Sequence, residues 1–301
     1  MKKALRDDEL AEIAKIVKET IFIPRNQKKV AVFLCGADIR DKKTFRSKMA
    51  SIFSEYPRYE ILYPEGLFDD LLAGQGQHSL LKLENILADS VDAIVLFPES
   101  PGSFAELGAF SNNPNLAKKM IVLANKKFKN HKSFINYGPN RLVRASKTGK
   151  VININYDDLD DVDEKHKIYR RVNDYITKIK KKHPVKQDVT NILEAENFIL
   201  PCIYLIDEVN NVTLYQLIEH ATSHDKTLCE IATKSSLGRL TANRLITRTP
   251  LGYKVTSAGA EYVRETFYDK FLDRARIELL NAQNRRNSRV KYDRVSQGAH
   301  L

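Results

Sequence analysis

The chain has 301 residues, of which 43% are hydrophobic and 29% are charged, and its net charge is +11. This composition excludes a disordered chain and predicts a globular protein with room for two domains. No apolar run approaches the roughly 18 residues that cross a bilayer. Residues 1–19 read as a charged amphipathic helix without the apolar core of a signal peptide, so we expect a cytoplasmic protein without a membrane partner.

The first half of the chain contains short apolar runs rich in β-branched residues, separated by segments with helical spacing. The runs are nearly continuous in hydrophobicity, which is typical of strands buried on both faces of a parallel sheet. They cover residues 30–35, 59–63, 91–97, 119–124 and 151–154. The sequence therefore predicts a doubly wound α/β domain with a mostly parallel sheet over residues 1–156.

Residues 157–190 begin acidic and end basic, as the dipole of a single helix prefers, and we interpret them as a helical connector. Residues 190–209 read as an apolar helix interrupted at Pro201. The three cysteines lie far apart and form no metal or disulfide pattern, which favours three small core residues and no metal site.

Residues 191–301 have the rhythm of a winged-helix domain with a basic tail. Helices are expected over residues 213–222, 226–232 and 235–246, then a two-stranded ribbon that turns at Pro250–Gly252, then a helix opened by Ser257. In helix-turn-helix relatives the third helix enters the major groove of DNA. That assignment directs these residues of the third helix and the wing toward DNA: Arg239, Thr241, Asn243, Arg244, Arg248 and Lys254. The alternative is a small domain that contacts only proteins.

The positive charge is segregated along the chain. No acid lies between Glu106 and Asp157 or between Ile231 and Ala260, and both windows are rich in lysine and arginine. Such one-sign stretches favour contact with nucleic acid over a merely solvated surface. Besides the winged-helix residues, the candidates are Lys126, Lys127, Lys129, Arg141, Arg144, Arg285 and Arg286.

Ligands of open parallel sheets bind outside the carboxyl ends of the strands. The segments that follow the first three strands carry the candidate substrate-binding residues, which are Gly36, Asp69, Asp70, His78, Gly102 and Ser103. Gly102 and Ser103 lead into a helix start whose backbone N–H groups can hold a phosphate or a ribose hydroxyl. The glycines form neither G-x-G-x-x-G nor a Walker loop, which argues against the usual dinucleotide and P-loop sites.

Two glutamates are the candidate catalytic residues. Ser103 and Glu106 have the S-x-x-E spacing of a capping box, so Glu106 alone could serve only to begin a helix. If Glu84 and Glu106 lie at the same sheet edge, the two carboxylates can divide nucleophilic and acid/base duties at the anomeric carbon of a sugar.

These motifs resemble the nucleoside 2-deoxyribosyltransferase family. The resemblance rests on Phe33-Leu-Cys-Gly36 in the first strand and on Gly102-x-x-x-Glu106-Leu107-Gly108 after the third. It implies that Glu106 attacks C1′ of a nucleoside, with Glu84 near the departing base. The family's leading aspartate is Ser100 here, and its strand-one tyrosine is Phe33, which puts ordinary transfer between free nucleosides in doubt.

A resemblance over nearly the whole chain is to the ribosyltransferase-like, DNA-binding effectors of bacterial retron defence systems. It is carried by FLCGAD, by residues 63–113, and by SFINYGPNRLVR, LPCIYL and GYKVTSAGAEYVR. It implies a toxic anti-phage effector that cleaves an N-glycosidic bond. It also implies restraint by the retron reverse transcriptase and its multicopy single-stranded DNA–RNA hybrid.

No cofactor is expected, with a nucleotide or NAD as the substrate. A homo-oligomer is an expectation, because related domains often complete their sites across subunits. Two alternatives stay open: a non-enzymatic winged-helix DNA-binding regulator with a nucleotide-sensing α/β domain, and an inactive glycohydrolase-like domain that sequesters a partner.

Overall fold

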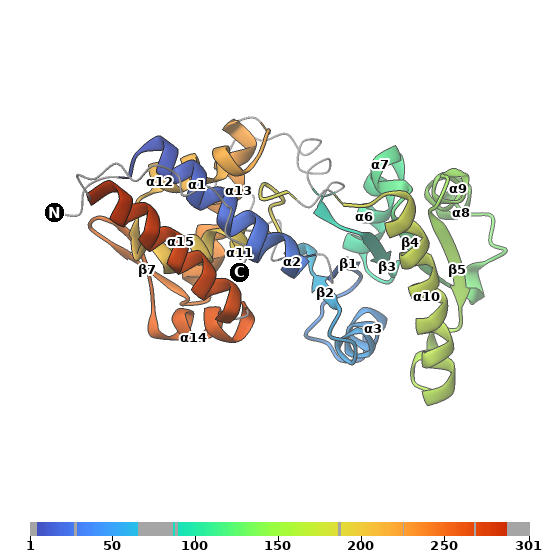
Figure 1. The fold of residues 1–301 in the computed structure, drawn as a ribbon. Coiled ribbons are helices and arrows are strands. Elements are labelled where there is room, and N and C mark those ends of the chain that lie inside the picture. Colours follow the sequence, from blue (N-terminus) through green and yellow to red (C-terminus); the bar gives the residue numbers. More distant parts are fainter. Residues whose placement is uncertain are drawn as a thin grey trace, which may run out of the picture. The chain divides into compact units, whose positions relative to one another are not determined.

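The computed structural model describes residues 5–26, 29–65, 87, 90–185, 188–224, 226–267 and 269–287 (Figure 1). The chain forms two compact units. One comprises Lys28–Gln187, and the other combines Met1–Gln27 with Asp188–Leu301.

A five-stranded parallel sheet forms the centre of the unit Lys28–Gln187, as predicted. Its strands are β1 (Val30–Cys35), β2 (Tyr59–Leu62), β3 (Ala93–Leu96), β4 (Met120–Asn125) and β5 (Lys150–Ile154). The order is β2-β1-β3-β4-β5, and every neighbouring pair is parallel. The chain leaves β1 toward β2 and then returns to β3 on the other side. The carboxyl ends of β1 and β3 therefore flank the switch point, where sheets of this kind bind ligands.

Helices cover both faces of this sheet. On one face, α3 (Phe45–Ser54) and α10 (Val162–Lys182) bury Met49 and Val172 in one cluster with Val32 and Leu34 of β1. On the other face, α6 (Pro101–Asn112) packs Phe110 against Phe33, with ring centroids 6.2 Å apart. The other elements among the described residues of this unit are the helices α7 (Pro114–Ala117), α8 (Phe134–Tyr137) and α9 (Pro139–Ala145), and the short turns η2 (Lys126–Phe128) and η3 (Tyr156–Leu159).

The second unit is mainly helical. Its elements are α1 (Asp7–Val17), η1 (Lys18–Phe22), α2 (Ile23–Asn26), α11 (Glu196–Ile206), β6 (Glu208–Val209), α12 (Asn211–Ala221), α13 (Lys226–Ala242), β7 (Ile246–Thr249), β8 (Gly252–Val255), α14 (Ser257–Thr266) and α15 (Asp269–Asn287). The three strands form an antiparallel sheet in the order β6-β8-β7, so the expected ribbon over β7 and β8 is present.

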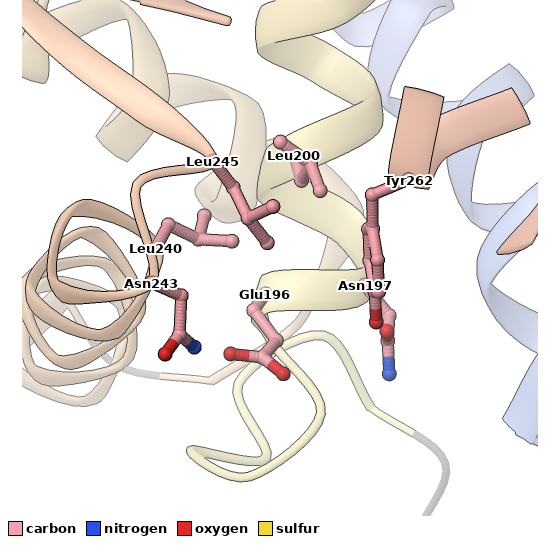
Figure 2. Close-up of a pocket in the computed structure, with 7 residues that line it drawn as sticks. All are labelled: Glu196, Asn197, Leu200, Leu240, Asn243, Leu245 and Tyr262. Carbon is pink, nitrogen blue, oxygen red and sulfur yellow. The ribbon is translucent and has the colours of Figure 1, made fainter. Parts of the chain in front are cut away.

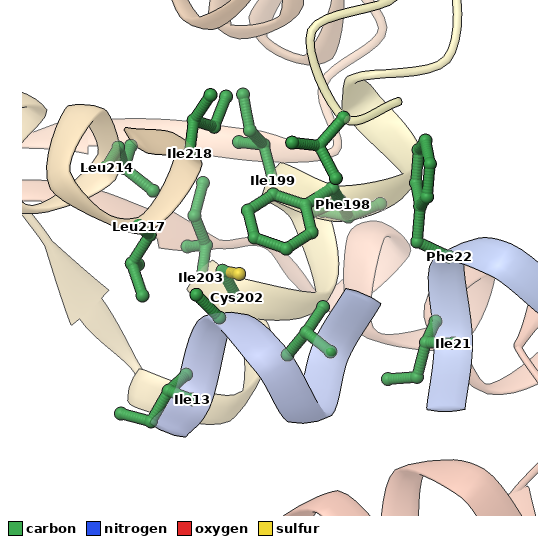
Figure 3. Close-up of a cluster of buried hydrophobic side chains, with 14 of the residues drawn as sticks. Ile13, Ile21, Phe22, Phe198, Ile199, Cys202, Ile203, Leu214, Leu217 and Ile218 are labelled. Atoms are coloured by element: carbon green, nitrogen blue, oxygen red, sulfur yellow. The ribbon is translucent and has the colours of Figure 1, made fainter. Parts of the chain in front are cut away.

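The units divide the chain differently from the sequence-based boundaries. Helix α1 lies within the expected α/β domain in sequence, yet Ile13 packs with Phe198 and Cys202 of α11 in the core of the other unit (Figure 3). The expected connector became α10, and its buried residues, such as Ile176, line the sheet core. Local pattern predicted both helices but could not specify which apolar surface each one covers.

Two expected helix interruptions are absent. The second and third helices predicted for the winged-helix region are one continuous helix, α13, in which the Thr233 hydroxyl donates to the Cys229 carbonyl at 2.8 Å. This hydrogen bond accommodates the polar middle of the helix. Helix α11 likewise continues through Pro201, because its buried neighbours Phe198, Ile199 and Cys202 hold the helix against the roughly 3 kcal/mol cost of an internal proline.

Candidate functional site

The start of α6 differs from the sequence-based prediction. Ser100 is the N-cap, and the capping box pairs Ser100 with Ser103 rather than Ser103 with Glu106. The Ser100 Oγ accepts from the Ser103 N–H at 3.2 Å and donates to the Gly36 carbonyl at 3.2 Å. The predicted Ser103–Glu106 box is therefore wrong, because a serine one turn earlier already caps the helix. Glu106 lies in the helix interior, where its carboxylate has no capping role.

The two residues proposed as helix-start donors have different surroundings. The Ser103 side chain is buried, and its Oγ accepts from the N–H groups of Glu99 and Ser100. Since its own N–H goes to Ser100, Ser103 has no donor left for a substrate. Gly102 is exposed in the first turn of α6, where a backbone N–H lacks a partner within the helix.

Glu106 faces the end of β1, and its carboxyl group has a strongly shifted pKa. Burial raises its pKa to about 7, although a hydrogen bond with Cys35 and the charge of Arg46 act in the opposite direction. The Cys35 thiol is fully buried, and burial together with the nearby Glu106 charge raises its pKa well above the ordinary value, so it is the neutral donor of that bond. Among the described residues, the buried Oε2 of Glu106 has no hydrogen-bond partner. A carboxyl group in this state can exchange a proton or attack a substrate near neutral pH.

Arg46 supplies a buried positive charge beside this carboxyl. Its guanidinium donates to both carboxylate oxygens of Glu65, each at 2.7 Å, and to the Ala37 carbonyl at 2.9 Å. The hydrogen bonds from Arg46 lower the pKa of Glu65. The guanidinium also lies over the Tyr63 ring, 5.0 Å from the centroid. The Arg46–Glu65 pair therefore fixes a cation at the switch point with two carboxyl groups around it.

Glu99 joins the loops at this sheet edge. Its carboxylate accepts from three backbone N–H groups, those of Ala37, Phe45 and Arg46, at 3.1, 2.9 and 3.0 Å. Gly36 is needed for this close approach, because a Cβ atom there would lie 2.6 Å from Arg46 Cβ and 2.7 Å from Glu99 Oε1. Sequence reasoning found Gly36 but assigned no role to Arg46, Glu65 or Glu99, which are distant in sequence. The signal for Glu65 and Glu99 was their place in the segments that follow the second and third strands.

Part of the predicted site lies outside the described residues. This holds for Glu84, Asp69, Asp70 and His78. The structure thus brings together Glu106, Gly36 and the α6 start from the predicted set, and adds Cys35 and Arg46. Within the described ranges, no group of three or more His, Cys, Asp or Glu side chains is placed to hold a metal ion.

The basic residues of the α/β unit are exposed. Lys126, Lys127 and Lys129 follow β4, and Arg141 and Arg144 project from α9. None of them forms an ion pair with a carboxylate in the part of the chain that the structure describes. Their charges are available to an anionic partner.

The predicted DNA contacts of the second unit are not equivalent. Arg239 points into its own unit: its Nε lies 3.1 Å from Glu196 and its Nη2 donates to the Ile192 carbonyl at 2.6 Å. Asn243 and Arg244 are exposed just after the end of α13, and Arg248 is exposed on β7. Lys254 is half exposed and lies 3.3 Å from Asp207, while Arg285 and Arg286 belong to α15.

The end of α13 also borders a pocket of about 220 Å³ (Figure 2). Leu200 and Glu196 come from α11, Asn243 follows α13, and Tyr262 comes from α14. Arg244, two residues after the end of α13, is in the left-handed region with φ of 58°, and the Leu245 N–H donates to the Leu240 carbonyl at 2.9 Å. This hydrogen bond is the closing bond of a Schellman motif, which turns the chain from α13 into β7.

The chain belongs to the STM3845 retron effector protein family, whose model matches residues 42–248. A protein of Escherichia coli named "Retron Ec86 putative ribosyltransferase/DNA-binding protein" is 44% identical to it over 302 residues, which cover 98% of each chain. A second E. coli protein, named "Retron Ec73 putative ribosyltransferase/DNA-binding protein", is 39% identical over 131 residues, covering 41% of this chain and 40% of its own. The resemblance to retron effectors noted in the sequence is thus confirmed.

Over the described residues, no helix combines the length and the apolar character that crossing a membrane requires.

Proposed function

We propose that this retron effector acts in anti-phage defence by cleaving the N-glycosidic bond of a nucleotide-type metabolite in the cytoplasm. The observation that carries the proposal is the environment of Glu106, a buried carboxyl with a pKa of about 7 at the β1–β3 switch point. The strand order, which is one of the common doubly wound orders, and the Gly102-to-Gly108 motif support a nucleoside 2-deoxyribosyltransferase-like domain.

The chemistry follows from the groups around Glu106. In its ionised form, the carboxylate attacks C1′ or stabilises the oxocarbenium ion as the bond to the base breaks. The base leaves with the bonding electrons and takes up a proton, and water or another acceptor then completes the sugar product. Arg46 favours the ionised carboxylate, and Glu84 is the proposed second acid. Ser100 caps α6 where related enzymes carry aspartate, so a substrate other than a free deoxynucleoside is favoured.

We further propose that the second unit is a winged-helix domain that binds the retron's multicopy single-stranded DNA–RNA hybrid. The element order α11-β6-α12-α13-β7-β8 and the sheet order β6-β8-β7 support this proposal. The exposed Arg244 and Arg248 are suitable phosphate contacts. Binding to the hybrid and its reverse transcriptase would restrain the toxic activity.

The test is base release by the purified protein. Nucleosides, nucleotides and NAD are incubated with the wild-type chain, with Glu106→Gln, and with a matched control, Glu55→Gln, whose side chain is 46% exposed at the end of α3. We expect one substrate class to release its base, with a loss of at least ~100-fold in Glu106→Gln only. Undiminished turnover by Glu106→Gln refutes the assigned role. Nucleotide binding with no base released, and with an unchanged metabolite profile in cells that express the free protein, favours the non-enzymatic regulator.

A further inference from the structure

A second pocket of the α/β unit lies near the carboxyl ends of β4 and β5. Its volume is about 240 Å³, and its walls include Phe104 of α6, Phe128 and His131 after β4, and the amides of Asn125, Asn136 and Asn140. Binding sites for drug-sized ligands occupy ~300–1,000 Å³, so this pocket has room for one ring system rather than for a whole dinucleotide.

The pocket is separate from the carboxyl group of Glu106. Phe104 and Glu106 are two residues apart on α6, so their side chains point about 200° apart around the helix. Glu106 interacts with Cys35 at the end of β1, whereas Phe104 borders the pocket beside Ala124 and Asn125 of β4.

The amides of this pocket have a defined orientation. The Asn136 Nδ2 donates to the carbonyl oxygens of Phe128 and His131, at 2.9 and 2.8 Å. The Asn136 Oδ1 must then accept, and it does so from the Asn140 Nδ2 at 3.0 Å. This chain of bonds leaves the Asn140 Oδ1 as a buried acceptor without a partner among the described residues, on a side chain that is 1% exposed.

An unsatisfied buried acceptor is rare in folded proteins, because the desolvated oxygen gains nothing in return. Asn140 lines the pocket, so a ligand that brings an N–H donor into it removes this deficit. A hydrocarbon ligand would leave the deficit in place. The pocket therefore selects a ring with a hydrogen-bond donor at its edge.

The rim of the pocket supplies aromatic surface and positive charge. Phe104 and Phe128 are 40% and 51% exposed, which leaves aromatic surface available to stack on a planar ring. Lys126, Lys127 and Lys129 surround Phe128 in sequence, and the Lys127 Nζ lies 5.8 Å from the centroid of its ring. A ring held in the pocket can thus carry an anionic group within reach of these lysines.

We propose that this pocket binds an amino-bearing nucleobase, adenine or cytosine, of a phosphate-carrying nucleotide. The exocyclic amino group donates to the Asn140 Oδ1, the ring packs on Phe104 and Phe128, and the phosphate faces the lysines after β4. The nucleotide is either free or an unpaired unit of a nucleic-acid strand. This site does not depend on whether Glu106 cleaves any bond.

Calorimetric titration of the full-length protein with AMP and purine riboside 5′-monophosphate tests the donor requirement, because the second nucleotide lacks the 6-amino group and has no N–H at its ring edge. We expect AMP to bind at least 10-fold more tightly than purine riboside 5′-monophosphate. Phe104→Ala and Asn140→Leu should each weaken AMP binding at least 10-fold. Phe134→Ala is the matched control, because Phe134 is 82% exposed and outside the pocket.

Single-stranded oligomers identify the source of the nucleotide. A six-residue deoxyadenylate that binds at least 10-fold more tightly than both AMP and a six-residue thymidylate assigns the site to a nucleic-acid strand. AMP binding equal to that of the deoxyadenylate assigns the site to a free nucleotide. The proposal is overturned if purine riboside 5′-monophosphate binds as well as AMP, if the two oligomers bind equally and AMP not at all, or if a folded Phe104→Ala protein keeps full affinity.

Discussion

Arg46 and Glu65 form a one-sided ion pair: the guanidinium is 1% exposed, whereas the carboxylate that receives its two 2.7 Å hydrogen bonds is 58% exposed. Removing Glu65 would leave a buried cation without its partner, while removing Arg46 would leave a carboxylate that water can solvate. Loss of Glu65 should therefore destabilise the fold through the unpaired buried cation, whereas loss of Arg46 leaves no unpaired buried charge.

We expect Glu65→Gln to lower the free energy of unfolding by about 1–3 kcal/mol, because Arg46 then loses a charged acceptor. A double-mutant cycle with Arg46→Met should give a coupling energy above ~0.5 kcal/mol in urea unfolding. The exposed Arg40–Asp38 pair, with a 2.9 Å contact, is the control and should show no measurable coupling. Equal coupling in both pairs would mean that burial of Arg46 has no energetic role.

The raised pKa of Glu106 predicts a pH-dependent stability. The neutral acid is favoured in the folded chain, with a pKa of about 7 against an ordinary 4.5. This contribution to stability is complete below about pH 4.5 and is lost as the pH rises through about 7. Relative to Glu106→Gln, the wild-type protein should lose up to about 3 kcal/mol over this window, measured by urea unfolding at a series of pH values. A constant difference between the two proteins would contradict the shifted pKa.

Cys35 tunes Glu106 through its thiol hydrogen bond, which favours the ionised carboxylate. In Cys35→Ala the pKa of Glu106 should rise further, so that the ascending limb of base release against pH moves to higher pH. Cys35→Ser keeps a donor and should leave the limb near its wild-type position. The measurement is the pH profile of kcat/KM, and an unmoved limb in Cys35→Ala would show that the thiol has no electrostatic effect.

Gly36 and Gly108 should respond in opposite directions to alanine. Gly36→Ala places a methyl group 2.6 Å from Arg46 Cβ, so we expect lower stability and loss of base release. At Gly108, inside α6, an added Cβ meets nothing within 4 Å, and alanine should raise the free energy of unfolding by about 0.5–1 kcal/mol. Thermal unfolding and base release of both variants test this contrast. A silent Gly36→Ala would mean that the β1 loop adjusts freely.

Arg239 and Arg248 separate structural from nucleic-acid roles in the second unit. Arg239→Gln should destabilise the fold by about 1–3 kcal/mol, because it breaks the contacts with Glu196 and Ile192. Arg248→Gln should leave the melting temperature unchanged and reduce the salt dependence of nucleic-acid binding by about one unit of slope. Binding titrations at several salt concentrations provide the measurement. If Arg248→Gln keeps the wild-type salt dependence of binding, Arg248 does not contact the nucleic acid.

The parallel sheet could be predicted from sequence because each strand carries its own signal, a short β-branched run buried on both faces. The β-ribbon that turns at Pro250–Gly252 could be predicted for the same reason, because its signal lies in a few neighbouring residues. The prediction of a Ser103–Glu106 capping box was wrong because the helix begins one turn earlier, where Ser100 is the N-cap and Ser103 is its capping-box partner. Only the observed helix start distinguishes the two positions.

The surroundings of Glu106 were beyond sequence reasoning for a different reason. Arg46 and Glu65 approach the switch point from α3 and the end of β2, 60 and 41 residues before Glu106 in sequence. Arg46 belongs to no recognisable motif, and the place of Glu65 after a strand does not reveal that Arg46 is its partner. The packing of α1 is a similar case, since an amphipathic helix indicates that it covers an apolar surface but not which one. Long-range contacts of this kind come from the fold as a whole.

The pairing of α1 with α11 has a consequence for synthesis. The two helices bury Ile13 and Phe198 in one hydrophobic core, yet α1 ends at Val17 and α11 begins at Glu196. At the usual ribosomal rate of about 5–20 residues per second, the apolar face of α1 waits roughly 10–35 s for its partner to emerge. The unit Lys28–Gln187 is completed during that interval, so α1 is buried later than helices that are made after it, and a chaperone can bind its apolar face before α11 emerges.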